Sequence, residues 1–307
     1  MSYSFNNHAI GKEEKLFMKS YSAILMLFID GLGIGTNDPA VNPIYAGNSP
    51  AIAKLMEKST PIDASLGIRG LPQSATGQTT LFTGINAPRI MGSHIEGFPG
   101  QALRKIIEEK NIFRQLSEIG KKSTFANAYF TTDIQEIKER SLKSVTTVAA
   151  LSAFGTVRGL DMLESGKAVY HDITREYLIS QGYKGDIITP EKAADDLLSI
   201  TLEHDFTLFE FFQTDRAGHT ADINAALRVL AKLDSFISAI MNHVLNSEIN
   251  VIIVSDHGNI EDISTTKHTS NKVPFIAIGK FFEKNKMNVS SLIDVTPEII
   301  RTLTHNK

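Results

Sequence analysis

The sequence contains no cysteine among its 307 residues. Disulfide bonds, thiolate metal ligands and a cysteine nucleophile are therefore excluded, so histidine and carboxylate side chains must hold any metal. The chain also lacks an excess of charge of either sign, since 31 basic residues stand against 34 acidic ones and the net charge is -3. This balance gives no broad basic surface, so we predict a protein that binds neither nucleic acid nor an anionic membrane.

Long apolar runs are missing as well. The first apolar stretch, Ala23–Ile29, is too short to span a bilayer, and it follows a polar leader containing Lys12 and Glu13 rather than a basic signal region. We therefore predict a cytoplasmic protein. Repeats and low-complexity tracts are absent, and a hydrophobic content of 42% over this length is enough to bury a large core.

What the sequence does contain is an alternation of apolar runs and amphipathic segments. We predict strands at 23–29, 122–129, 206–212, 250–254 and 273–278, and helices at 48–58, 74–82, 101–119, 190–204, 223–245 and from 294 or 296 to 303. The alternation favours an α/β fold, with a mostly parallel central sheet covered by helices on both faces. Glycines break up the pattern in one region, so we predict a core, 1–129 and 190–307, interrupted by a small inserted cap at 130–189.

Three predicted strands are each followed by an acidic residue. Asp30 follows the first strand, Asp215 the strand at 206–212, and Asp256 the strand at 250–254. Parallel strands present their carboxyl ends at one edge of a sheet, so these side chains are expected to meet there. Histidines accompany two of them, since His257 adjoins Asp256 and His219 stands four residues after Asp215, on one face of a helical turn. Each motif alone is an ordinary polar turn or solvated helix face, but together they predict a metal site.

Two further segments adjoin these residues. Gly31, Gly33 and Gly35 follow Asp30 at alternate positions. This is not the Gly-x-Gly-x-x-Gly spacing of a dinucleotide site, so we interpret the glycines as freeing the backbone to turn. Ser74 begins a predicted helix, where free N–H groups and the helix dipole favour an anion such as phosphate or sulfate.

Four motifs resemble the metal-binding segments of the alkaline phosphatase superfamily, and most of all its branch of cofactor-independent phosphoglycerate mutases and phosphopentomutases. In chain order they are Asp30-Gly31, Asp215-x-x-x-His219, Asp256-His257-Gly258-Asn259-x-Glu261 and His268-Thr269-x-Asn271-x-Val273-Pro274. The resemblance implies a three-layer alkaline-phosphatase-like fold and two divalent metal ions. The implied ligands are Asp215, His219 and His268 for one metal, and Asp30, Asp256, His257 and the Ser74 oxygen for the other.

Ser74 matches the nucleophile of that superfamily, which lies ten residues before a glycine that often follows threonine, here Thr83-Gly84. The resemblance therefore implies phosphoryl transfer on a small phosphate ester through a phosphoserine, as a phosphomonoesterase or a phosphomutase. Two cations can clamp the attacking and the leaving oxygen at once. Three carboxylates and three imidazoles suit Mn or Zn better than Mg, which prefers oxygen ligands and retained waters.

The sequence departs from the mutase pattern at two points. Gln78 stands where the mutases often have His or Asn, and the chain has no room for the long inserted phosphotransferase domain of the glycerate enzyme. Candidate substrate contacts are Gln78, Asn86, Arg89, Arg158 and Arg216, with His94, Lys167, His171, Asp172 and Arg175 as further candidates. For most of these, a solvated charge or a cap is the more ordinary use, whereas for Arg216 a surface salt bridge is an equally ordinary one.

Two other function classes stay open. A phosphodiesterase or a sulfatase of the same superfamily would share the ligands, although Ser74 stands in Gln-Ser-Ala-Thr-Gly rather than in the Ser-x-Pro-x-Arg context of a sulfatase. A metal-stabilised binding protein that has lost turnover would share them too. The intact nucleophile and the full ligand set favour catalysis over that alternative.

Overall fold

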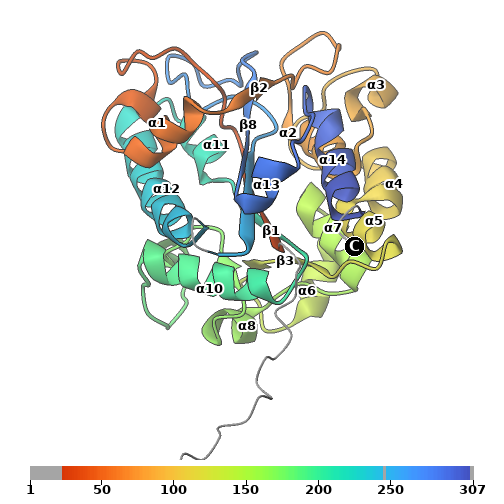
Figure 1. Ribbon diagram of the computed structural model, residues 1–307. Coiled ribbons are helices and arrows are strands. Elements are labelled where there is room, and N and C mark those ends of the chain that lie inside the picture. Colours follow the sequence, from red (N-terminus) through yellow and green to blue (C-terminus); the bar gives the residue numbers. More distant parts are fainter. Residues whose placement is uncertain (1–22, 245–246, 305–307) are drawn as a thin grey trace, which may run out of the picture.

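A six-stranded sheet forms the centre of the computed structural model, which describes residues 23–244 and 247–304 (Figure 1). Its strands, in spatial order, are β2 (Thr60–Ile62), β8 (Val273–Ile278), β7 (Ile249–Val254), β1 (Ala23–Ile29), β6 (Phe206–Phe211) and β3 (Ser123–Phe125). The polar leader with Lys12 and Glu13, and Leu245 at the end of a predicted helix, lie outside the described residues.

The sheet is mostly parallel, as predicted, but it is mixed. β1 pairs in parallel with both β6 and β7, and β3 pairs in parallel with β6. β8 is antiparallel to β7 and to β2, so it alone among these strands points the other way. The carboxyl ends of β7, β1 and β6 therefore lie side by side at one edge.

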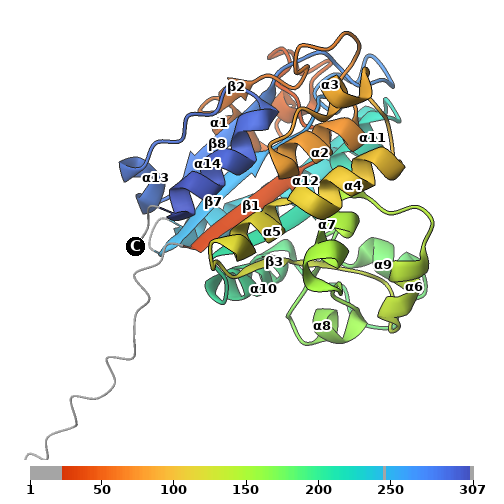
Figure 2. The ribbon, with the colours of Figure 1, turned by 90° about the vertical axis from the view of Figure 1, so that its right-hand side faces the viewer.

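Helices cover both faces of the sheet and complete three layers (Figures 1 and 2). The helical layer on one face holds α2 (Ser74–Thr83), α4 (Gln101–Lys110), α5 (Ile112–Glu118), α7 (Val145–Phe154) and α14 (Leu292–Thr304). The helical layer on the other face holds α1 (Pro50–Met56), α10 (Pro190–Leu202) and α12 (Ile223–Val244), with the short η1 (Pro43–Tyr45). Alternate residues of β1 enter the two cores, Met26 and Phe28 on one face, Leu27 and Ile29 on the other. Burial on both faces explains the unbroken apolar run of this strand.

The single helix predicted at 101–119 is wrong. The chain leaves helical geometry at Asn111, whose φ of -66° and ψ of 156° are extended. The Asn111 side chain accepts a hydrogen bond from the Arg114 backbone N–H, which is the N-cap arrangement that starts a new helix. Apolar periodicity continues across the break and hides it. The last helix also differs, because it begins at Leu292 rather than at 294 or 296.

The strand predicted at 122–129 is wrong in its second half. The chain leaves the central sheet after Phe125, and β4 (Asn127–Ala128) pairs instead with β5 (Val169–Tyr170) in a separate two-stranded sheet. At the point of departure the Asn127 side-chain amide takes over the pairing. Its Nδ2 donates to the Glu210 carbonyl at 2.8 Å, and its Oδ1 accepts from the Glu210 N–H at 2.8 Å.

That residues 130–189 form a separate cap domain stays a prediction. Its segment contains β5, α6 (Ile134–Glu139), α8 (Leu160–Glu164) and α9 (Glu176–Ser180), which lie beside the β3 edge of the sheet (Figure 2). A small separate core joins Ala128, Leu163, Ala168, Tyr170, Leu178 and Tyr183. By contrast, α7 lies in the middle of the segment yet packs into the main core with Val145 and Val148.

Candidate metal centre and nucleophile

One acidic cluster lies where β1 and β7 end. Asp30, Asp256 and His257 are buried, and their ligand atoms lie within 4.8 Å of one another. His257 Nε2 is 3.2 Å from Asp30 Oδ1 and 3.5 Å from Asp256 Oδ2. Ser74, at the first turn of α2, brings its Oγ to 2.9 Å from the same His257 nitrogen. The fold thus gathers the four residues predicted for one metal.

A second cluster lies at the short helix α11 (Gln213–Gly218), which follows β6: Asp215 is on the helix, His219 caps its end, and His268 comes from the loop before β8. His219 Nε2 is 3.3 Å from Asp215 Oδ2, and His268 Nε2 is 3.4 Å from Asp215 Oδ1. The two imidazole nitrogens, of His219 and His268, are 3.2 Å apart. The clusters adjoin, because the His257 and His268 rings stack with their centroids 3.7 Å apart.

Backbone carbonyls fix the tautomers of two of these histidines. His268 Nδ1 lies 2.9 Å from the Pro72 carbonyl, and His219 Nδ1 lies 2.8 Å from the Thr266 carbonyl. A carbonyl can only accept, so each Nδ1 carries a proton and each ring directs its Nε2 into the cluster. Two imidazole nitrogens that face each other beside a carboxylate form an arrangement that a shared cation fits.

The first cluster also fits a cation. Asp30 Oδ1 and Asp256 Oδ2 are buried without a hydrogen-bond partner. Burial, and then the nearby charges of Asp256, Asp215 and Glu210, raise the pKa of Asp30 well above its ordinary value. Buried carboxylates held together in this way are stabilised by a metal ion, and the donor set is the carboxylate and imidazole set that Zn and Mn accept.

Asp215 is held in its ionised form. Burial alone would raise its pKa, but contacts with His268, His257, Asn259 and His219 outweigh burial and lower the pKa to about 2. Asn259 Nδ2 donates to Asp215 Oδ1 at 2.7 Å and to the Asp215 carbonyl at 3.1 Å. Asn259 therefore fixes the orientation of a candidate ligand.

Glu261 connects the loops that carry the two clusters through hydrogen bonds. Its Oε2 accepts from the Gly33 N–H at 3.0 Å and from the Asn259 N–H at 2.7 Å, and its Oε1 accepts from Thr269 Oγ1 and from Asn271 Nδ2. The side chain is only 1% exposed.

This carboxylate also explains the glycines after Asp30. A Cβ on Gly33 would overlap the Glu261 carboxylate, and one on Gly35 would lie 2.7 Å from the Glu261 carbonyl oxygen. Gly31, whose φ is 70°, is the residue that turns the backbone. The interpretation of all three as turn residues therefore applies to Gly31, whereas Gly33 and Gly35 make room for Glu261.

Gln78 and Arg216 lie next to the clusters. Gln78 Nε2 donates to Asp30 Oδ2 at 3.1 Å, so this predicted substrate contact touches a candidate ligand. The exposed Arg216 guanidinium lies 5.4 Å from the Phe212 ring centroid and 5.6 Å from that of Tyr177.

Arg158 does not reach the clusters. Its guanidinium donates to the Phe125 and Lys167 carbonyls and to Thr124 Oγ1. Thr124 is level with Leu25 across β6, five residues before Asp30, which places it about 16 Å away along the strand direction. Arg158 thus joins β3 to the segment around Lys167.

The other predicted contacts have local partners. Asn86 caps α3 (Ala87–Met91) by accepting from the Arg89 N–H, and Arg89 itself is exposed. His94 Nε2 lies 3.3 Å from the Ile68 carbonyl. Asp172 accepts from the Arg175 and Tyr177 N–H groups. A role of these residues in substrate binding stays a prediction.

Sequence reasoning missed Glu210. This residue of β6 is buried, its Oε2 accepts from Thr146 Oγ1 at 2.6 Å, and burial raises its pKa to about 7, with a further contribution from the charge of Asp256. The signal was present, since Glu210 is the only charged residue in the apolar run 206–212.

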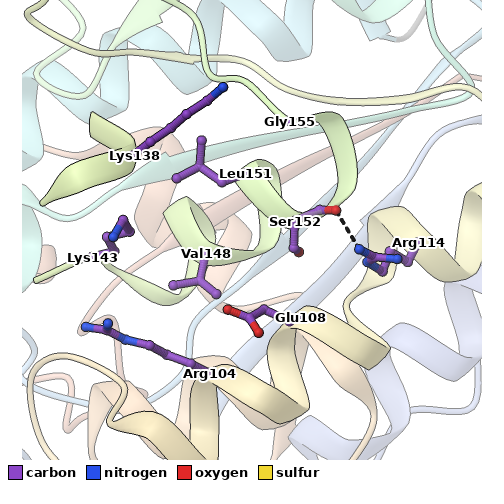
Figure 3. Close-up of a pocket in the computed structure, with 9 residues that line it drawn as sticks. All are labelled: Arg104, Glu108, Arg114, Lys138, Lys143, Val148, Leu151, Ser152 and Gly155. Atoms are coloured by element: carbon purple, nitrogen blue, oxygen red, sulfur yellow. Dashed lines mark hydrogen bonds between the residues drawn. The ribbon is translucent and has the colours of Figure 1, made fainter. Parts of the chain in front are cut away.

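A basic cavity of about 490 Å³ lies elsewhere, between α4 and α7 (Figure 3). Its lining includes Arg104, Arg114, Lys138 and Lys143, with Glu108 among them. None of the cluster residues lines it, and Arg114 donates to the Ser152 carbonyl rather than pointing freely inward. The candidate metal centre is therefore separate from this hollow.

Known families and structures match the chain over different lengths. A family model described as the metalloenzyme superfamily matches residues 22–307. The 2,3-bisphosphoglycerate-independent phosphoglycerate mutase of Ehrlichia canis (strain Jake) is 30% identical over 129 residues, which are 38% of this chain and 26% of that protein. The mutase of the same name from Mycoplasmoides gallisepticum is 33% identical over 129 residues, 38% of this chain and 25% of that protein. The chain thus spans about a quarter of the length of these curated relatives.

Solved structures match almost the whole chain at low identity. The PH0037 protein from Pyrococcus horikoshii has a TM-score of 0.58 and 14% identity, and covers 92% of this chain and 97% of its own. Alkaline phosphatase from the Antarctic bacterium TAB5 has a TM-score of 0.54 and 13% identity, and the match covers 93% of this chain and 99% of the phosphatase chain. At such identities the likeness shows the fold alone, and it confirms the predicted alkaline-phosphatase-like architecture.

Proposed function

The chain belongs to the metalloenzyme superfamily, within the alkaline phosphatase superfamily, and from this premise we propose that it is a dinuclear phosphoryl-transfer enzyme acting on a small phosphate ester. One observation carries the proposal: the Ser74 hydroxyl lies 2.9 Å from His257 Nε2, at the edge where both candidate ligand clusters meet. A nucleophile, two adjacent sets of metal ligands and a helix N-terminus together suit phosphoryl transfer, which depends on positioning and charge neutralisation.

Asp30, Asp256, His257 and Ser74 would hold one divalent ion, and Asp215, His219 and His268 the other, with Mn or Zn preferred by this donor set. Such ions supply charge neutralisation for the transferring group and a lowered pKa for the serine hydroxyl. Gln78 and Asn259 keep the Asp30 and Asp215 carboxylates in place. The carbonyls of Pro72 and Thr266 keep the Nε2 atoms of His268 and His219 directed inward.

The proposed reaction has two steps, formation of a phosphoserine and transfer of its phosphoryl group to an acceptor. Ser74 Oγ bonds to phosphorus as the ester P–O bond breaks, so the serine loses its proton and the departing alcohol gains one. In hydrolysis, a water oxygen then bonds to phosphorus, the Oγ–P bond breaks, and Ser74 regains a proton. In a mutase reaction, a second hydroxyl of the same substrate replaces the water. Both outcomes share the phosphoserine, and they differ only in the acceptor.

Within the part of the chain that the structure describes, no helix is both long and apolar enough to cross a membrane. The cytoplasmic location and the lack of nucleic-acid partners stay predictions.

Metal content and turnover of p-nitrophenyl phosphate test the proposal together. We expect about two metal ions per chain by elemental mass spectrometry after loading with Mn or Zn, and turnover that disappears in Ser74→Ala while the circular dichroism spectrum stays unchanged. Ser199→Ala, on the exposed face of α10, is the matched control and should retain full activity. Equal turnover by Ser74→Ala and the wild type would contradict the nucleophile assignment. Metal binding without any turnover would instead favour a non-catalytic relative.

A further inference from the structure

A cavity of about 240 Å³ lies between β4, β5, the start of α7 and the end of β6. Most of its large side chains are aromatic: Phe125, Tyr129, Phe130, Tyr170, His171 and Phe212. Arg140, Ser144, Thr147 and Glu210 add polar groups to the lining. We call this cavity the ring pocket.

The ring pocket lies near the candidate metal centre, although none of the cluster residues lines it. Glu210, which lines the pocket, is level with Phe28 of β1, two residues before Asp30. Alternate residues of a strand face the same side, so Glu210 and Asp30 point to the same face of the sheet, about 7 Å apart along the strand direction.

Most polar groups of the ring pocket already have partners within the protein, and Arg140 is paired with Glu136 beside the pocket. Both ends of the Asn127 amide pair with the Glu210 backbone. The Tyr129 hydroxyl lies 2.7 Å from Thr147 Oγ1, and Thr146 donates to the Glu210 carboxyl group. A polyol or a carboxylate would find few partners here, because such ligands need unoccupied donors and acceptors.

The aromatic faces form a continuous wall. The His171 ring centroid lies 4.3 Å from that of Tyr170 and 4.3 Å from that of Phe212. Burial, and then the charge of Arg216, lower the pKa of His171 to about 3, so the imidazole is neutral at physiological pH. An uncharged aromatic wall favours a planar ring, which stacks against aromatic side chains.

We propose that the ring pocket receives the base of a nucleoside 5′-monophosphate whose phosphoryl group lies at the two ligand clusters. This proposal rests on the phosphoryl-transfer function proposed above and names its substrate class. A sugar is the spacer that joins a phosphate to a flat heteroaromatic ring in such a ligand, and Glu210 of the pocket lies about 7 Å along the strand from Asp30 of the first cluster. The pocket volume suits such a fragment rather than a larger ligand.

Adenosine 5′-monophosphate and ribose 5-phosphate make a matched pair, because they differ in the base while the ester bond is the same. For the metal-loaded wild type we expect kcat/KM to be about 10-fold or more higher for the nucleotide, the effect of stacking a single base. Phe212→Leu and Phe130→Leu, which remove a ring while keeping an apolar side chain, should reduce this ratio toward one. Phe154→Leu, a partly exposed phenylalanine outside the ring pocket, is the control and should keep the wild-type ratio.

Adenosine, which has no phosphate, separates failure of this proposal from failure of the proposed function. If Ser74-dependent turnover is present but the two phosphates react equally and adenosine does not inhibit, the ring pocket assignment is overturned while phosphoryl transfer stands. If no phosphate ester reacts, saturation-transfer NMR of adenosine with the metal-loaded protein still decides. Binding that Phe212→Leu loses and Phe154→Leu keeps supports the ring pocket, and absence of binding overturns it.

Discussion

Removal of the Glu261 carboxylate is the perturbation for which the structure gives the clearest magnitude. In Glu261→Ala, the buried backbone N–H groups of Gly33 and Asn259 lose their acceptor. A buried donor left without a partner costs about 1–3 kcal/mol, so the two together should lower the free energy of unfolding by about 2–6 kcal/mol. This is a large fraction of the stability of a typical domain.

Glu261→Gln is the conservative variant and should be far milder. The amide oxygen can keep accepting from the two backbone N–H groups, and the amide nitrogen can donate to Thr269 Oγ1, which also accepts; only the half-buried Asn271 Nδ2 loses its acceptor. We expect a loss of about 1 kcal/mol, reflecting the weaker hydrogen bonds of a neutral acceptor. Glu109→Ala, at an exposed position of α4, serves as the control and should change stability by no more than about 0.5 kcal/mol.

Urea unfolding of the metal-free protein, followed by circular dichroism, measures these differences without the added complication of bound metal. A separate Zn titration should show an affinity about 10–100-fold lower in Glu261→Ala, since Asn259, which orients Asp215, depends on the same carboxylate. If Glu261→Ala were as stable as Glu109→Ala, the hydrogen bonds that Glu261 makes between these loops would not contribute to stability, and the prediction would be wrong.

Three further outcomes follow from the geometry. Gly33→Ala should weaken metal binding, measured by titration, because its Cβ would overlap Glu261, whereas Gly100→Ala, where the added atom meets open space, should not. Arg158→Met should lower the free energy of unfolding by about 2 kcal/mol with kcat unchanged, because its hydrogen bonds are structural; lost kcat at wild-type stability would contradict this. Glu210 has its pKa raised from 4.5 to about 7, so it stabilises the fold below pH 4.5, and this stability is lost as the pH rises toward and past 7. In metal-free protein the loss of stability between pH 4.5 and 8 should be smaller in Glu210→Gln than in the wild type by on the order of 3 kcal/mol, because Asp30 contributes equally to both; identical pH profiles would contradict the raised pKa of Glu210.

Local signals in the sequence were sufficient where a local rule governed the structure. The strand Ala23–Ile29 was predicted with its observed bounds because burial on both faces requires a continuous apolar run. The helix beginning at Ser74 was predicted because Pro72 and Gln73 precede it, and in the structure it ends at a left-handed Gly84. The break at Asn111 was missed because the apolar spacing of two consecutive helices can imitate one helix.

The sequence by itself determined the residue types of the candidate centre and their order along the chain. Carboxylates and imidazoles placed after buried strands were enough to predict one shared edge, since parallel strands present their carboxyl ends together. Tertiary structure alone decided which atoms face each other: the carbonyls that orient His219 and His268, the hydrogen bond from Gly33 to Glu261, and the place of Glu210 in the lining of the ring pocket. These contacts join segments up to 228 residues apart in the chain, and no local propensity or periodicity encodes such distances.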